Sequence, residues 1–467
     1  MITKQVIDHR QLAWLTASIL ITETLASIPH GLANISKTDV WFTQIIPILY
    51  ALLIASFFYT VSKKFPGKNI FEVTSLLLGN WGGKAVNILF FLYIWIILVR
   101  DVREISEFVG FFLLSETPSE VILFLFILVM LYYGKTSIEV IARVNALFVP
   151  VYLLAMAFLP VLLANEINPE RALPILSTGF LPLGTANVIG LSSYGDLLIL
   201  GAFLPSLADT RLFKASVRYG TLLAGVVITI VLFVAIVAMG ATITSKFYYP
   251  VYLLVEQIHI TDFLDRVEVL LFSAWFPAFT LKIMVLYSAF FICLGAIFNN
   301  TDCRKFNIQG GVFIFLTSYF SFERINELAH FIKYSLPLIV LGFQPAFMLL
   351  IYTVSKLSKK TTHSNIEITD GQVDESENKQ VGSVNTDVDK KPKACRSTWF
   401  TWSALAFVIL GKVLHSFSMW FAIACAAAYF TSLLLALWFS YQTFRRSRRR
   451  SLQENVQHEP SLEGAKG

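Results

Sequence analysis

The chain has 467 residues, of which 56% are hydrophobic and only 15% are charged. Soluble domains carry about a quarter charged residues, so this composition excludes an ordinary soluble globular protein. The formal net charge of +6 requires no nucleic-acid partner, because the cytoplasmic loops of membrane proteins are basic in general.

The apolar residues gather in blocks that suit membrane-spanning helices, each of which takes about 20 residues. The ninth block, 309–322, is the shortest. In chain order, the predicted core spans are 12–34, 41–62, 86–113, 119–134, 140–164, 188–208, 216–240, 267–298, 309–322 and 334–355. We therefore predict an all-α, multi-pass integral membrane protein.

Lysine and arginine are distributed unevenly between the loops that join these spans. With the N-terminus in the cytoplasm, 16 of them lie in inner segments and 6 in outer loops. Basic residues remain preferentially on the cytoplasmic side of a membrane. The bias therefore predicts a cytoplasmic N-terminus and an even number of core spans.

The composition changes after the ten-span core, which we assign to residues 1–358. Residues 359–397 are polar and predict a flexible cytoplasmic linker. An apolar stretch at 398–443 follows, and the tail 444–467 opens with the basic block Arg445–Arg450. We interpret 398–443 as a transmembrane hairpin that turns near Lys412–Ser418, because linker and block should both face inward. The alternative is a surface helix over 399–411 with one span after it.

Two of the core spans contain residues that can interrupt a helix. Span one holds Ser27-Ile28-Pro29-His30-Gly31, and span six holds Ser192-Ser193-Tyr194-Gly195-Asp196. Proline removes a backbone donor, and glycine permits unusual dihedral angles. Transporters built from two inverted repeats of five spans bind solutes where the first span of each repeat is interrupted. The pattern favours such a 5+5 fold, and a kinked helix without a ligand is the alternative.

Charged residues inside the spans are costly and usually face a cavity or a partner. Span three carries Arg100, Asp101, Arg103 and Glu104. Arg100 and Glu104 are four residues apart and share a helix face, so they form either an internal ion-pair cluster or an arginine clamp on a ligand carboxylate.

Two further charges lie in spans one and eight. Lys282 sits among aromatic residues, which we interpret as lipid-facing or packing residues and not as a cation cage, and Asp196 is a candidate partner for it. Glu23 shares a helix face with Ser27. The candidate ligand-binding residues are Glu23, Thr24, Ser27, Pro29, Arg100, Glu104, Ser193, Tyr194, Gly195, Asp196, Phe279, Lys282 and Tyr287.

The sequence contains no motif for catalysis. G-x-S-x-G, H-E-x-x-H and P-loop patterns are all missing, and the four cysteines have no metal-binding spacing. We therefore expect no enzyme activity, no cofactor and no metal. The expected partners are a small solute and membrane lipid.

Several short motifs, taken in order, resemble the spore germination permease family, which is the B subunit of bacterial germinant receptors. This family is a branch of the amino acid/polyamine/organocation superfamily. The similarity runs from about residue 4 to 358. The matching pieces are Asp39-Val40-Trp41, Lys64-Phe65-Pro66-Gly67-Lys68, Leu78-Gly79-Asn80-Trp81-Gly82-Gly83, Thr117-Pro118-Ser119-Glu120, Ile138-Glu139-Val140-Ile141-Ala142-Arg143, Leu173-Pro174-Ile175-Leu176, Tyr249-Pro250, Phe263-Leu264-Asp265-Arg266-Val267-Glu268 and Trp275 followed by Lys282.

The chain departs from the family pattern at two positions. Asp196 stands where members often have glutamate, and members often have a glycine near the position of Leu25. The resemblance implies a germinant receptor subunit in the spore inner membrane. Such a subunit binds a small nutrient such as an amino acid and works with an A subunit and a lipoprotein C subunit. An ion-coupled amino acid transporter and a scaffold without a ligand are the alternatives.

Overall fold

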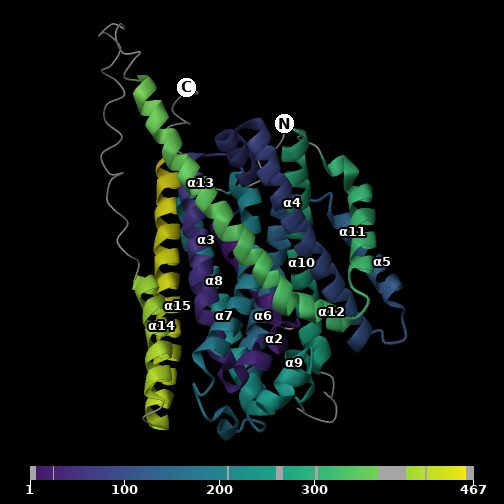
Figure 1. The fold of residues 1–467 in the computed structure, drawn as a ribbon, viewed down its shortest axis with the longest axis vertical. Helices are drawn as coiled ribbons and strands as arrows, with labels where there is room; N and C mark the ends of the chain where they lie inside the picture. The colour runs from purple at the N-terminus through teal and green to yellow at the C-terminus, as the bar shows by residue number, and fades with distance from the viewer. Residues whose placement is uncertain are drawn as a thin grey trace.

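The computed structural model describes residues 7–24, 26–207, 210–258, 267–299, 303–366, 396–415 and 418–458. In these ranges the secondary structure is helical, apart from one isolated bridge between Ile7 and Leu207. Most of the helices lie along the long axis of the molecule (Figure 1). The predicted all-α architecture is confirmed.

The first half of the core contains the elements that correspond to predicted spans one to five. Span one is divided between two helices, α1 and α2, which are joined by a short 3-10 turn, η1. A second 3-10 segment, η2, leads into α3. The bounds are α1 His9–Ile21, η1 Thr22–Thr24, α2 Ile28–Ser36, η2 Lys37–Gln44, α3 Ile45–Lys64, α4 Ile70–Phe112, α5 Ser119–Tyr133, α6 Ile138–Leu162 and η3 Pro169–Ala172.

The second half follows the same plan. Span six is divided between the helix α7 and the 3-10 segment η4, and short elements connect the later spans. The bounds are α7 Phe180–Gly195, η4 Asp196–Ser206, α8 Thr210–Lys246, α9 Pro250–Glu256, α10 Val267–Phe298, η5 Cys303–Phe306, α11 Asn307–Ser321, α12 Ile325–His330, the π-helical turn η6 Phe331–Ser335 and α13 Leu336–Ile366.

The interruption in span one lies before its predicted position, the one in span six lies where it was predicted, and the two differ in local form. In span one the helix ends at Ile21 and resumes at Ile28, so the break precedes the predicted proline. Pro29 lies in the first turn of α2, where its missing N–H costs nothing because that N–H has no intrahelical partner. In span six the change from α-helix to 3-10 helix falls between Gly195 and Asp196. Leu25 lies outside the described residues.

Span three begins earlier than its apolar core. A helix starts at Ile70 behind an Asn69–Glu72 capping box, and the chain bends at Gly79, whose φ is 74°. That dihedral is readily adopted only by glycine. The stretch between the two residues is therefore a separate short helix that leads into the span.

Within the described part of the chain, nine helical segments are long and apolar enough to cross a bilayer. Two of them are α14, Arg396–Leu414, and the start of α15, Met419–His458. Three predicted spans are not among the nine. Spans four and nine are the helices α5 and α11, which have only 15 residues each. Span one is not a single long helix because it is broken. The fold is that of an integral multi-pass membrane protein.

The C-terminal helices α14 and α15 lie side by side along one edge of the molecule (Figure 1). They dock on the core: the Tyr429 hydroxyl donates to the Trp41 carbonyl at 3.2 Å, and Lys412 Nζ donates to the Leu176 carbonyl at 2.5 Å. At the other end of the pair, the Phe444 ring lies 5.5 Å from that of His9. The predicted linker falls largely in residues 367–395, which lie outside the described residues, as do 459–467 of the tail.

Candidate functional site

Buried charges from four separate elements meet in the middle of the core. Arg100 on α4 lies 2.7 Å from Asp101, 3.2 Å from Glu23 and 3.1 Å from Asp196. Lys282 on α10 lies 3.1 Å from Asp101 and 2.8 Å from Asp196, and its ammonium also contacts Glu23. We call these five residues together with Glu104 the charge cluster.

The breaks in spans one and six bring the acids into the charge cluster. Glu23 lies in η1, after α1 has ended, and Asp196 is the first residue of η4. Both carboxylates therefore come from the ends of helices, whereas Arg100 and Lys282 project from the middle of continuous ones. The cluster joins the two half-chains at the points where their helices are interrupted.

The charge cluster is buried and carries excess negative charge. Its side chains are at most 3% exposed. Four carboxylates face two cations among the described residues, a formal charge of −2 when all are ionised. Asp196 Oδ1 and Glu104 Oε2 are buried and have no hydrogen-bond partner in the described part of the chain. Buried polar atoms are nearly always paired, so the cluster has spare capacity for a positive group.

Glu104 lies on the edge of the charge cluster and holds the start of α2. Its Oε1 accepts hydrogen bonds from the Ser27 backbone N–H at 2.8 Å and from the Ser27 hydroxyl at 2.6 Å. Its Oε2 lies 3.9 Å from Arg100. One carboxylate thus links the broken span one to α4.

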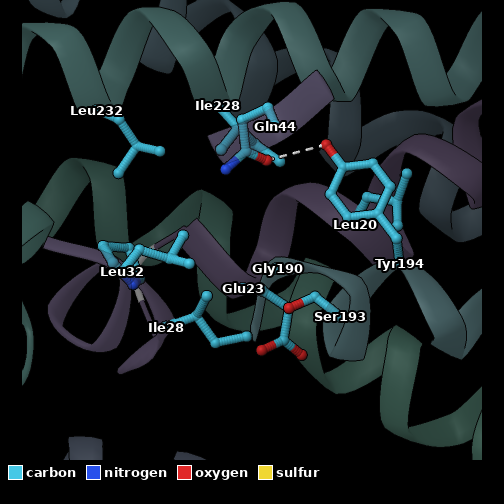
Figure 2. Close-up of a pocket in the computed structure, with 11 residues that line it drawn as sticks. Leu20, Glu23, Ile28, Leu32, Gln44, Gly190, Ser193, Tyr194, Ile228 and Leu232 are labelled. Carbon is cyan, nitrogen blue, oxygen red and sulfur yellow. Dashed lines mark hydrogen bonds between the residues drawn. The ribbon is translucent and has the colours of Figure 1, made fainter. Parts of the chain in front are cut away.

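A small cavity adjoins the charge cluster and reaches from the break in span one to α7 and α8. Five aliphatic side chains form most of its wall: Leu20, Ile28, Leu32, Ile228 and Leu232. Polar groups lie at two places on the wall (Figure 2). Glu23 and Ser193 lie together at one of them. At the other, the Tyr194 hydroxyl donates to Gln44 Oε1 at 3.2 Å.

The cavity has a volume of about 20 Å³. About 10–15 Å³ on this measure accommodates one water molecule, so the cavity in this conformation has room for little more. The Ser193 hydroxyl is buried and has no hydrogen-bond partner in the ranges that the structure covers. The cavity is therefore a small pocket in which this hydroxyl, without a partner among the described residues, lies beside a carboxylate.

Most of the residues predicted from the sequence meet here. Glu23, Pro29, Ser193 and Tyr194 line the cavity. Ser27, Arg100, Glu104, Asp196 and Lys282 are bonded to one another in or beside the charge cluster. Gly195 lies between the two groups, and its carbonyl accepts from Gln344 Nε2 at 2.9 Å. The side chain of Thr24 lies outside the described residues.

The two predicted aromatic residues Phe279 and Tyr287 do not line the cavity. The Phe279 ring centroid lies 5.7 Å from Lys282 Nζ and 5.1 Å from the Trp275 ring, in the buried core. Tyr287 is not part of the site: its hydroxyl donates to the Asn307 carbonyl at 2.7 Å. Five residues along a helix correspond to a rotation of about 140°, so Tyr287 points away from Lys282.

Several residues at the site are not in the predicted ligand-binding set. Asp101 contacts both cations of the charge cluster. Trp275 Nε1 donates at 2.8 Å to the Thr22 carbonyl, which lies where α1 has ended. Gln44 accepts a hydrogen bond from the Tyr194 hydroxyl, and Gln344 donates one to the Gly195 carbonyl. Asp101 was visible as a charge in an apolar span, but neutral amides give no such signal.

Three carboxylates of the charge cluster have the spacing of a cation site. The oxygens of Glu23, Asp101 and Asp196 lie within 4.8 Å of one another. Lys282 contacts all three. The lysine ammonium thus supplies a positive charge at a place where oxygen ligands converge.

Comparisons with known proteins agree with this architecture. The family model described as "Spore germination protein" matches residues 6–325. YfkT of Bacillus subtilis (strain 168) is 26% identical over 335 residues, which cover 71% of this chain and 91% of that protein. Spore germination protein KB of the same organism is 23% identical over 353 residues, covering 73% and 93%.

A solved structure shows the same fold. Mhp1, a nucleobase-cation-symport-1 family transporter in a closed conformation with bromovinylhydantoin bound, superposes with a TM-score of 0.56. The alignment covers 95% of this chain and 94% of Mhp1 at 13% identity. At this identity the likeness shows the fold alone, which is the predicted inverted-repeat transporter fold.

Proposed function

Since the chain belongs to the family of spore germination proteins, we propose that it is the permease-like subunit of a germinant receptor. It binds a small nutrient, an amino acid, in the cavity beside the charge cluster. Occupancy of the cavity then triggers germination through A and C partner subunits. The chain is an integral multi-pass membrane protein, and the spore inner membrane fits its family.

The observation that carries the proposal is the position of Glu23. Its carboxylate lies on the wall of the cavity and also contacts Arg100 and Lys282. An ammonium group in the cavity would therefore compete with both cations for the same carboxylate. Binding of the ligand and the arrangement of α4 and α10 are coupled through this one side chain.

The cavity wall also fits the other parts of an amino acid. Ile28 and Pro29, at the start of α2, line it, and the N-terminal turn of a helix attracts negative charge such as a carboxylate. Ser193 adds a hydroxyl that has no hydrogen-bond partner among the residues described. The aliphatic wall favours a small aliphatic side chain. Because the cavity accommodates little more than one water, binding requires the walls to separate.

We expect Asp196→Asn to abolish the germination response to amino acids while the protein still reaches the membrane. The change removes one of the carboxylates that hold Arg100 and Lys282, at 3.1 and 2.8 Å. The measurement is the dose-response of spores that carry the variant, with membrane levels determined by immunoblotting.

Glu139→Gln is the matched control for this experiment. Glu139 forms an i,i+4 pair with Arg143, whose side chain is 66% exposed, and such surface pairs contribute little. This control should germinate like the wild type. A normal dose-response in the Asp196→Asn variant would exclude the proposed role of the charge cluster.

One observation favours a second function, that of an ion-coupled amino acid transporter. The convergent oxygens of Glu23, Asp101 and Asp196 could take up a coupling cation if Lys282 moved. Uptake of radiolabelled amino acids into vesicles that contain the purified protein separates the two functions. Saturable uptake driven by a sodium or proton gradient supports the transporter, whereas binding without uptake supports the receptor.

A further inference from the structure

A surface groove lies between α4, α10 and α11, away from the charge cluster. Its volume is about 570 Å³, and its wall is mainly aromatic and aliphatic. Phe91 comes from α4, Phe291 and Leu294 from α10, and Phe313 from α11. Phe298 and Phe306, at one end, are 68% and 49% exposed. An exposed apolar surface of this kind is favourable in contact with the hydrocarbon of the membrane.

A second groove, of about 510 Å³, runs along the neighbouring face of α10. It shares Phe291 with the first groove and ends at Lys68 and Asn69, where α4 begins. The two grooves therefore flank the C-terminal end of α10. One is apolar over most of its length, and the other ends in polar side chains.

A basic side chain lies at the polar end, since Lys68, which precedes α4, lines the second groove. Arg304 lies in η5, which follows α10 in the chain and contains Phe306 of the first groove. Glu72 also lines the second groove, but its carboxylate accepts the Asn69 N–H at 3.1 Å in the capping box. In the described part of the chain Lys68 has no ion pair. Both basic residues follow helices that return to the side of the N-terminus, which the distribution of lysine and arginine assigns to the cytoplasm.

We propose that the two grooves form a binding site for one anionic phospholipid. Its acyl chains occupy the apolar surface of the first groove, and its phosphate lies near Lys68 at the polar end of the second. The charge at the polar end favours an anionic headgroup over a zwitterionic one. The site joins α4 and α10, the helices that carry Arg100 and Lys282.

Native mass spectrometry of the full-length protein in mild detergent tests this site. The protein is incubated with phosphatidylglycerol or with phosphatidylcholine of the same acyl chains. The wild type should retain one phosphatidylglycerol molecule and less phosphatidylcholine. Lys68→Gln should lose the preference for phosphatidylglycerol, and Leu294→Trp, which fills the apolar groove, should lose both lipids.

Two controls keep the result specific. Lys63→Gln removes an exposed lysine near the end of α3, and Leu338→Trp enlarges a side chain of α13 that is 72% exposed. Both should retain lipid like the wild type. The proposal is overturned if Lys68→Gln and Leu294→Trp retain phosphatidylglycerol as the wild type does, or if the wild type binds the two lipids equally.

Discussion

At the scale of single residues, the centre of the molecule depends on two cations shared among several acids. Arg100 and Lys282 each contact Glu23, Asp101 and Asp196. In a buried site the attraction between such charges must offset the loss of their hydration. Sharing keeps every carboxylate near a cation, and it lets a change at one acid affect the others.

Lys282→Met should therefore lower the stability of the protein strongly. The variant leaves three buried carboxylates to Arg100 alone, and breaking a buried ion pair costs about 3–5 kcal/mol. We expect a lower melting temperature and a reduced amount in the membrane. Adding Asp101→Asn to Lys282→Met should restore part of the loss, because it removes one uncompensated charge.

Lys246→Met serves as the control for this series, since Lys246 is exposed at the end of α8. It should melt like the wild type. Equal melting temperatures and equal abundance of the wild type, Lys282→Met and the double variant would show that these residues are not coupled as the geometry indicates.

The sequence predicted parts of this cluster, the grouping of Arg100 with Glu104 and Asp196 as a partner for Lys282, because charges in apolar spans have few alternatives to pairing. Arg100, Asp196, Lys282 and Glu23 were identified for that reason. Asp101 is not among the predicted ligand-binding residues, although it is a charge in the same apolar span. The contact that matters, 3.1 Å from Asp101 to Lys282, depends on how α10 packs against α4, which spacing along one helix does not determine.

At the scale of elements, the two interruptions differ in how they are built. In span one the helix stops and restarts, and α2 begins with Ile28 and Pro29. In span six the backbone only changes from α-helix to 3-10 helix after Gly195. The sequence indicated where both irregularities lie to within a few residues. It misplaced the first because proline is equally compatible with the start of a helix.

Gly195→Ala should weaken the contact between α7 and α13. A Cβ atom at this position would lie 2.8 Å from Gln344 Nε2 and 2.9 Å from Val340 Cγ1, and overpacking of this kind costs about 1–3 kcal/mol. Gly184→Ala on the same helix is the control, since no described atom lies within 4 Å of its Cβ position. The free energy of unfolding, measured by denaturation in detergent, should fall for Gly195→Ala alone. Equal stability of the two variants would contradict the packing described here.

At the scale of the whole molecule, the C-terminal hairpin is attached to the core at both of its ends. Lys412, near the turn, bonds the loop between α6 and α7, and Phe444 packs on the rings of Tyr219 and His9. The basic residues that follow Phe444 therefore lie on the side of the N-terminus. The sequence anticipated a hairpin from charge alone, but the surface that it covers, along α8 and η2, follows from tertiary packing.

This arrangement predicts that Ser447 faces the cytoplasm. A cysteine introduced at Ser447 in an otherwise cysteine-free protein should be protected from a membrane-impermeant thiol reagent in intact cells. It should react after permeabilisation. Labelling without permeabilisation would place the basic block outside and require an odd number of crossings.

The central claim is that a nutrient amine binds to Glu23 in the cavity. Thermal melting of the purified wild type, Glu23→Gln and Glu139→Gln, each with a panel of the common amino acids, tests it most directly. A ligand at 100 times its Kd stabilises the folded state by about 2.7 kcal/mol. We predict that at least one amino acid raises the melting temperature of the wild type and of Glu139→Gln but not that of Glu23→Gln. An equal rise in Glu23→Gln, or no rise with any amino acid in the wild type, would contradict the claim.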